Sequence, residues 1–139
     1  MTVDVKYPIG KHQMVPFSIE EKEARLADVL FLPRMLEYAV LNLNDDQIQT
    51  PYREGGWTVN QVIHHVADSH MNAYIRTKHI ITQDQNQIQP YDENAWATSL
   101  DANFHHEASY LILLGLHQKW SLLLLESLKD AANQLVKTL

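Results

Sequence analysis

Apolar residues recur at helical spacing along most of the chain, and no useful length alternates with the period of two that a strand requires. The first predicted helix begins after Ser18, where Ser18 and Glu21 match a capping box. Its apolar positions run from Leu26 to Leu43. Pro33 lacks a backbone donor and should kink or divide this helix.

The same capping signal, a short polar residue followed three positions later by Gln, recurs at Asn44–Gln47 and at Thr58–Gln61. The first instance predicts a short turn or helix, and residues 50–56 read as a loop. The second predicts a long helix from Val59 to about Ile81, with one apolar face.

Residues 82–103 are polar, contain Pro90 and predict a long irregular connection, a feature that is often functional. A last strong helix is predicted from about Ala102 to Leu128, followed by a weakly amphipathic tail over 129–139. The sequence thus predicts an all-α domain spanning 1–139, with an irregular N-terminal arm over 1–17. Three long helices on the scale of a four-helix bundle leave a fourth unaccounted for.

Composition narrows the classes of function. The chain has 139 residues, no cysteine and a net charge of −6, which excludes disulfide scaffolds and cysteine nucleophiles and disfavours nucleic-acid binding. Residues 1–17 lack an apolar run of signal-peptide length. Polar residues interrupt Tyr110–Leu125, so it reads as a core helix rather than a membrane span. We therefore expect a soluble cytoplasmic protein.

Histidine is unusually frequent, with eight residues against eleven Lys and Arg. The densest cluster lies on the second long helix and comprises His64, His65, Asp68 and His70. His70 points close to the centre of the apolar stripe, whereas His64 and His65 flank it on opposite sides. The spacing does not choose between His64 and His65 as a metal ligand. From the spacing alone, the favoured interpretation is one core histidine and two surface histidines.

Other candidates carry weaker signals. His105 and His106 begin the last predicted helix, and His117 is eleven residues beyond His106, so those two could share a face. Four aromatic residues in or beside the two loops either line a ligand pocket or cover the end of the bundle: Tyr52, Trp57, Tyr91 and Trp96.

The block Thr50–Lys78, TPYREGGWTVNQVIHHVADSHMNAYIRTK, is similar to a known protein family. It resembles the signature of the YfiT-like branch of the DinB superfamily. Three further segments match in order and spacing: YPIGK at 7–11, IQPYDENAWA at 88–97 and LHQKW at 116–120. The resemblance therefore covers nearly the whole chain.

The resemblance implies a four-helix bundle with a long crossover, often assembled as a homodimer. Members are described as metal-dependent hydrolases that bind one divalent metal, zinc or nickel, through three histidines. Better-studied relatives transfer low-molecular-weight thiols such as bacillithiol or mycothiol. The expected partners are a small-molecule substrate or thiol and a second copy of the chain, without nucleic acid or membrane.

The resemblance also suggests roles for individual residues. The family's first metal ligand precedes Leu/Val-Ala-Asp, which makes it His65 in HHVAD, with His64 as a neighbour. Asp68 is then expected to orient an imidazole N–H. Tyr91 and Trp96, in their loop, and the inward-facing His70 are candidates for the pocket.

The chain departs from the family pattern at its end. The family's other two ligands come from a His-Gly-x-His-His motif on a final helix, and no such motif occurs up to Leu139. A truncated or frameshifted gene, or a fragment of a longer chain, would explain this. Alternatively, an uncovered apolar face could dimerise, with another copy supplying His105, His106 or His117.

Two hypotheses follow. The first is a metal-dependent hydrolase or thiol S-transferase in which a metal held partly by His65 activates water or a thiolate as the nucleophile. The second is a truncated, non-catalytic helical module that self-associates and has lost the metal.

Overall fold

The structure of the chain, a computed structural model, describes residues 7, 10, 11, 13, 16–83 and 89–137, with side chains described as far as residue 130. Its elements in order are α1 (Ile19–Val40), α2 (Asp45–Ile48), α3 (Val59–Gln83), α4 (Glu93–Ala97), the 3₁₀ helix η1 (Leu100–Asn103) and α5 (Glu107–Lys137). These residues form no strand, only an isolated bridge between Pro51 and Thr58. The predicted all-α class is confirmed.

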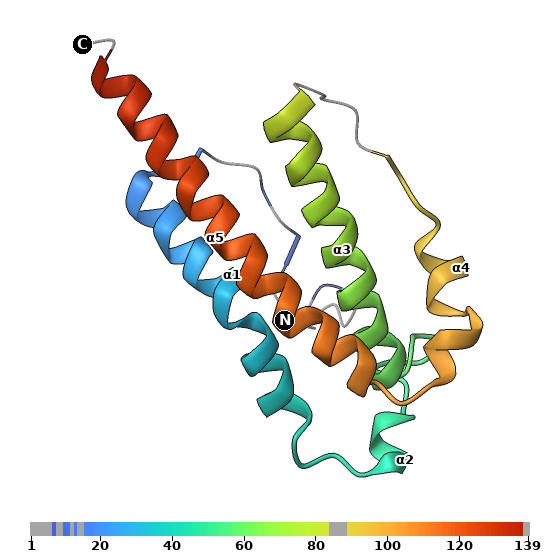
Figure 1. Cartoon of the computed structure of the whole chain (residues 1–139). Coiled ribbons are helices and arrows are strands. Elements are labelled where there is room, and N and C mark those ends of the chain that lie inside the picture. The colour runs from blue at the N-terminus through green and yellow to red at the C-terminus, as the bar shows by residue number, and fades with distance from the viewer. Residues whose placement is uncertain (1–6, 8–9, 12, 14–15, 84–88, 138–139) are drawn as a thin grey trace.

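Helix α5 holds the long helices together, because it packs against both α1 and α3 (Figure 1). The short helix α2 lies at the end of the molecule where α1 leads into α3, and α4 and η1 pack on α3. The largest fully buried apolar side chains of the described residues are Ile63 of α3, Leu113 of α5 and Pro33 of α1. The described core therefore lies where α5 packs against α1 and α3.

The predicted capping boxes are confirmed. Glu21 N–H donates to Ser18 Oγ at 3.2 Å, and Ser18 N–H donates to Glu21 Oε2 at 2.7 Å. The reciprocal bonds also form at Asn44–Gln47 and at Thr58–Gln61. Pro33 does not divide α1, which continues through it with the proline ring buried. Burial of the ring offsets the one helical hydrogen bond that the missing N–H removes.

Two sequence-based boundaries are wrong. The connection over 82–103 is not irregular throughout, because Asp92 caps α4 by accepting a hydrogen bond from Ala95 N–H at 3.0 Å. The last helix begins at Glu107 instead of Ala102, since η1 ends in the extended residue Phe104. The acidic Glu107 suits that helix start.

The expected tail after Leu128 is also helical, as far as Lys137. Good helix formers such as alanine, lysine and glutamine extend α5 through this stretch although its amphipathic pattern is weak. Most of the expected arm over 1–17 lies outside the described residues, and the described part of it forms no helix.

One described helix is long and apolar enough, over Glu107–Asp130, to cross a membrane by length and composition alone. Core helices of soluble proteins pass the same test. Leu113, His117 and Ser121 of this helix are buried against the rest of the protein, and 22% of the apolar window as a whole is buried.

Candidate functional site

Both ring nitrogens of His64 make hydrogen bonds. It is buried on α3, where Nδ1 lies 2.7 Å from Ser109 Oγ and Nε2 lies 3.0 Å from the carbonyl oxygen of Phe104. A carbonyl only accepts, so Nε2–H is the donor to Phe104 and the Ser109 hydroxyl donates to Nδ1. Metal binding by His64 would break one of these two buried hydrogen bonds.

His70 points inward and joins a relay that connects the three long helices. Its Nδ1 lies 2.7 Å from His117 Nε2 on α5, and His117 Nδ1 donates to the carbonyl of Val29 on α1. Because Val29 O can only accept, His117 Nε2 carries no proton in the neutral ring and accepts from His70 Nδ1–H. His70 Nε2 is then the unprotonated nitrogen that the relay leaves free.

Burial keeps this relay neutral. Desolvation, together with the neighbouring His117, lowers the pKa of His70 to about 4, and desolvation also lowers the pKa of His117. The indole of Trp120 meets both rings edge-on at 5.9 Å and donates to Thr77 Oγ1 at 3.2 Å. At neutral pH the relay therefore links the helices without placing a charge in the core.

His65 has a different environment, although it is the next residue after His64. Its half-buried ring lies 4.7 Å from the ring of Trp57 and makes no hydrogen bond to a described residue. The two rings border an apolar hollow of about 400 Å³, which is also lined by Tyr52, Val59 and Val62. Both ring nitrogens of His65 are thus available to a ligand.

Asp68 does not orient an imidazole in the way the resemblance suggests. Its carboxylate makes no hydrogen bond to a described histidine, although it lies within electrostatic range of His64 and His65. Burial, and then the charge of Asp101, raise the pKa of the Asp68 carboxyl. The carboxyl therefore accepts a proton more readily than an ordinary aspartate.

The loop aromatics divide into two pairs. Tyr52 and Trp57 line the hollow beside His65. Tyr91 and Trp96 instead contact each other, with ring centroids 4.8 Å apart, where α4 packs on α3. The predicted contribution of Tyr91 and Trp96 to the pocket is therefore not seen in this hollow.

The described residues do not form a complete metal centre. A catalytic zinc normally takes three protein ligands, and no group of three His, Asp or Glu side chains among the described residues is placed to hold an ion. His117 is committed to the relay, and the stacked rings of His105 and His106 lie against a pocket that does not include His65. Among the described residues, none is placed beside His65 as part of a three-ligand metal site.

Some residues that fix α3 in place were not predicted from the sequence. Asn60 is buried and donates from Nδ2 to the carbonyls of Ala102 and Phe104, at 3.1 and 2.9 Å. Its position three and four residues before Ile63 and His64, on the face that packs against the core, is the signal that could have revealed it. No comparable signal pointed to Val29, whose backbone carbonyl ends the relay.

Comparison with known proteins gives a consistent picture. The model of the DinB superfamily matches residues 31–138. The chain is 46% identical over 136 residues to a protein of Geobacillus thermodenitrificans named "Putative metal-dependent hydrolase", covering 96% of this chain and 76% of that protein. It is 48% identical over 123 residues to a protein from Oceanobacillus iheyensis that is also named a putative metal-dependent hydrolase. That match covers 86% of this chain and 70% of the relative.

A solved structure agrees with the fold. YfiT from Bacillus subtilis, described as "a probable metal-dependent hydrolase with an unusual four-helix bundle topology", superposes with a TM-score of 0.84 at 43% identity. The match covers 88% of this chain and 71% of YfiT. With the family model covering most of the sequence and these relatives matching over more than two thirds of their length, the chain belongs to the DinB superfamily.

Proposed function

We propose that this chain is the scaffold of a metal-dependent hydrolase or thiol S-transferase, with His65 as one metal ligand and the remaining ligands supplied from outside the described residues. The observation that carries the proposal is the free imidazole of His65, at the family's ligand position, on a chain 41–48% identical to relatives named as metal-dependent hydrolases. Zinc and nickel are the metals we expect, since imidazole suits both.

The chain's own residues would position His65 and receive the substrate. The His64 and His70 networks fix the rotation of α3 against α5, so they also fix the direction of His65. The lining of the hollow beside His65 is almost wholly apolar. The hollow therefore suits the carbon skeleton of a small molecule better than a charged group. The proposed substrate is therefore a small molecule, an ester or a thiol with an electrophilic partner.

Metal content per chain tests the ligand role. We expect about one zinc or nickel per chain of dialysed protein if a second copy completes the centre, and loss of that metal in His65→Ala. His79→Ala is the matched control, because His79 is an exposed histidine on the same helix, bonded to Gln83. Equal metal content in both variants would contradict the role of His65.

Turnover separates the two reaction classes. A bacillithiol-type thiol with a chloro-aromatic electrophile probes S-transfer, and a panel of esters probes hydrolysis. We expect one activity that depends on added metal and is lost in His65→Ala but kept in His79→Ala. No metal-dependent turnover in either assay would remove the enzyme proposal.

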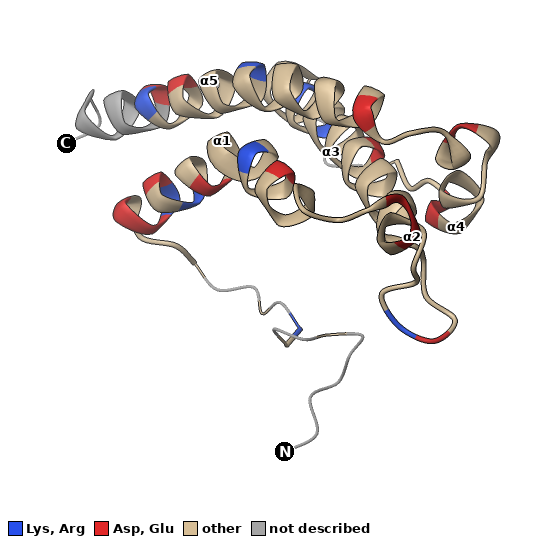
Figure 2. Cartoon of the chain, turned by 90° about the horizontal axis from the view of Figure 1, so that it is seen from below, with Lys and Arg blue, Asp and Glu red and all other residues tan. Residues whose placement is uncertain are grey.

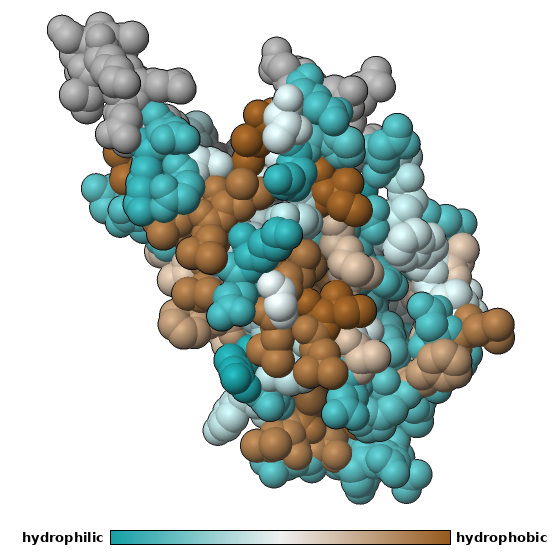
Figure 3. All heavy atoms as spheres, in the orientation of Figure 1, coloured by the Kyte–Doolittle hydropathy of each residue, from teal (hydrophilic) through white to brown (hydrophobic). Residues whose placement is uncertain are grey.

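A second function, a non-catalytic module that self-associates, is favoured by exposed apolar side chains on α1 and α5. Phe31, Met35, Leu111 and Leu122 are 57–65% exposed, and Figure 3 shows apolar surface running over both helices. Such a surface marks an interaction site. A homodimer is the assembly we propose for both functions. Sedimentation that gives a monomer at all micromolar concentrations would remove self-association.

A further inference from the structure

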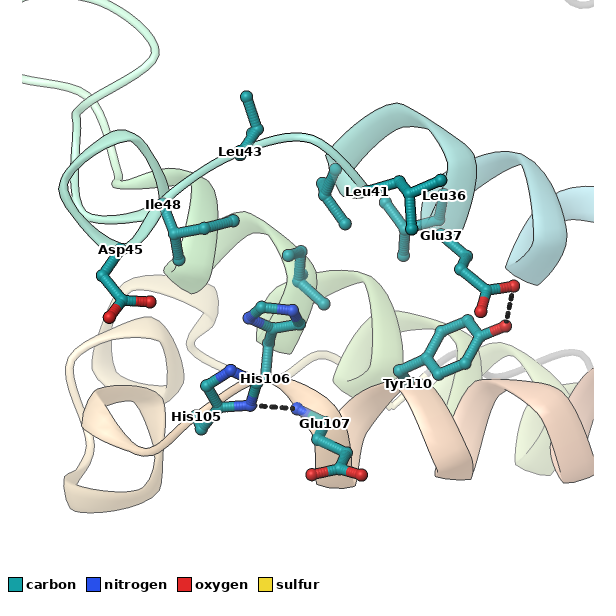
Figure 4. A pocket seen from close by; sticks show the side chains of 12 residues that line it. Leu36, Glu37, Leu41, Leu43, Asp45, Ile48, His105, His106, Glu107 and Tyr110 are labelled. Atoms are coloured by element: carbon teal, nitrogen blue, oxygen red, sulfur yellow. Dashed lines mark hydrogen bonds between the residues drawn. The ribbon is translucent and has the colours of Figure 1, made fainter.

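A pocket of about 300 Å³ lies at the end of the molecule where α1, α2 and the start of α5 meet (Figure 4). Its volume is at the lower end of the range for small-molecule sites. Half of the lining residues are aliphatic: Leu36, Val40, Leu41, Leu43, Ile48 and Ile63. The pocket does not include His65, whose ring contacts Trp57 instead.

One buried polar atom among the residues that line this pocket has no partner in the described part of the chain. It is His106 Nδ1, which makes no hydrogen bond to a described residue, whereas the ring itself is stacked on His105 with centroids 4.4 Å apart. Figure 4 shows the His106 ring reaching into the space beside Ile48. A buried nitrogen without a hydrogen bond is costly, so a ligand that supplies one would gain affinity from it.

The charged side chains that line the pocket are acidic. Glu37, Asp45 and Glu107 are among the lining residues, and none of the described Lys or Arg residues lines it. Glu37 is neutralised by Arg34 at 2.9 Å and also accepts a hydrogen bond from the Tyr110 hydroxyl. Asp45 and Glu107 form no ion pair with a described residue, and Figure 2 shows the acidic start of α2.

We propose that this pocket binds a small protonated amine with an apolar body. The aliphatic lining would take the carbon skeleton, while the ammonium group donates a hydrogen bond to His106 Nδ1 and faces Asp45 and Glu107. Burial lowers the pKa of His106, so its ring is neutral at pH 7 and offers the acceptor that an ammonium donor needs. The site is separate from the metal-ligand position at His65.

Three probes of nearly equal shape test the charge preference: 1-naphthylmethylamine, 1-naphthalenemethanol and 1-naphthoate. Calorimetric titration of the 139-residue protein should give the tightest binding for the amine, by about 5-fold over the alcohol and about 10-fold or more over the carboxylate. Raising the salt concentration should weaken the amine selectively, because it screens the two carboxylates. Equal affinities for the three probes would overturn the proposal.

Variants locate the binding. His106→Phe keeps an aromatic ring and removes the nitrogen, so it should weaken binding of the amine by about 5-fold. The double variant Asp45→Asn, Glu107→Gln changes exposed side chains that are not part of the core. Its affinity for the amine should fall to its affinity for the alcohol. His79→Phe is the control and should bind all three probes as the unaltered chain does.

Two outcomes would show that the pocket is not the amine site. The first is amine binding that survives unchanged in both His106→Phe and the double variant, which would place the probe on another apolar surface. The second is no saturable binding of the amine at millimolar concentration by a chain with an unaltered helical circular-dichroism spectrum.

Discussion

Two sides of α3 bear neighbouring histidines with opposite environments. On the side facing α5, His64 is bonded on both nitrogens and His70 joins a relay through His117 to Val29. On the other side the ring of His65 lies against the ring of Trp57, makes no hydrogen bond to a described residue and borders an apolar hollow. One residue of helical rotation separates a structural histidine from an open one.

Hydrogen bonding divides the histidines of this cluster into structural residues and a residue that is open to a ligand. Bonded rings tie α1, α3 and α5 together. His64 and His117 use both of their ring nitrogens, and His70 keeps only Nε2 free. The unbonded ring contributes little to that packing and keeps its donor atoms free. Stability and ligand binding should therefore respond to different histidines.

His117→Ala should cost about 3–4 kcal/mol in the free energy of unfolding. The ring is 1% exposed, and its loss leaves a cavity and removes the partners of His70 and Val29. Urea denaturation followed by circular dichroism measures the change. His79→Ala should stay within about 0.5 kcal/mol, as expected for an exposed residue. Similar values for the two variants would mean that the relay does not hold the helices together.

Asn60→Ala should cost about 2–3 kcal/mol. The substitution removes the Asn60 donor to the Ala102 carbonyl and one of the two donors to the Phe104 carbonyl, which His64 Nε2–H also reaches. It also removes a side chain that is 2% exposed. The same denaturation experiment applies. A cost below that of Gln61→Ala, which removes a half-buried neighbour bonded to Ala97, would show that Asn60 does not anchor the crossover.

Stability should fall with acidification from pH 7 towards 5. The folded-state pKa of His70 is about 4 and that of His117 is also lowered, so below about pH 6.5 the unfolded chain binds more protons than the folded chain. Solvent screens the half-buried His70, which limits the expected loss to about 1–2 kcal/mol.

His70→Phe isolates this contribution. The variant should show a flatter dependence of the unfolding free energy on pH over the same interval, because the titrating ring is gone. A slope as steep as that of the unaltered chain would assign the acid sensitivity to other groups.

Gly115→Ala should stabilise the protein by about 0.5–1 kcal/mol, the smallest effect and the only gain. Gly115 lies inside α5, and a Cβ added there meets nothing within 4 Å. A thermal unfolding scan measures the shift. A loss of stability would indicate that something in solution packs closely against this part of α5, as a second copy of the chain would.

The sequence predicted the local structure well where a chemical signal marked it. Ser18, Asn44 and Thr58 cap helices as their spacing indicated, because capping depends on residues only three positions apart. The start of α5 was misplaced, since the extended conformation at Phe104 depends on the contacts of Asn60 from another helix. Long-range contacts of that kind leave no periodic pattern in the sequence.

The site was predictable in part. The apolar stripe indicated that His70 faces inward, as it does. It could not distinguish His64 from His65, which lie on opposite edges of the stripe, and only the positions of Ser109 and Phe104 determine which ring is bonded. The partners of His117 and the unbonded nitrogen of His106 depend on how α5 docks, which composition and spacing do not specify.

We propose that His65 is the metal-binding histidine on α3, while His64 and His117 are structural. Long-range ¹H–¹⁵N NMR spectra of the histidine rings, recorded during a zinc titration, test this assignment. The His65 ring nitrogens should shift first, and the His64 and His117 signals should keep their hydrogen-bonded positions. Early shifts of His64 or His117, with His65 unchanged, would contradict it.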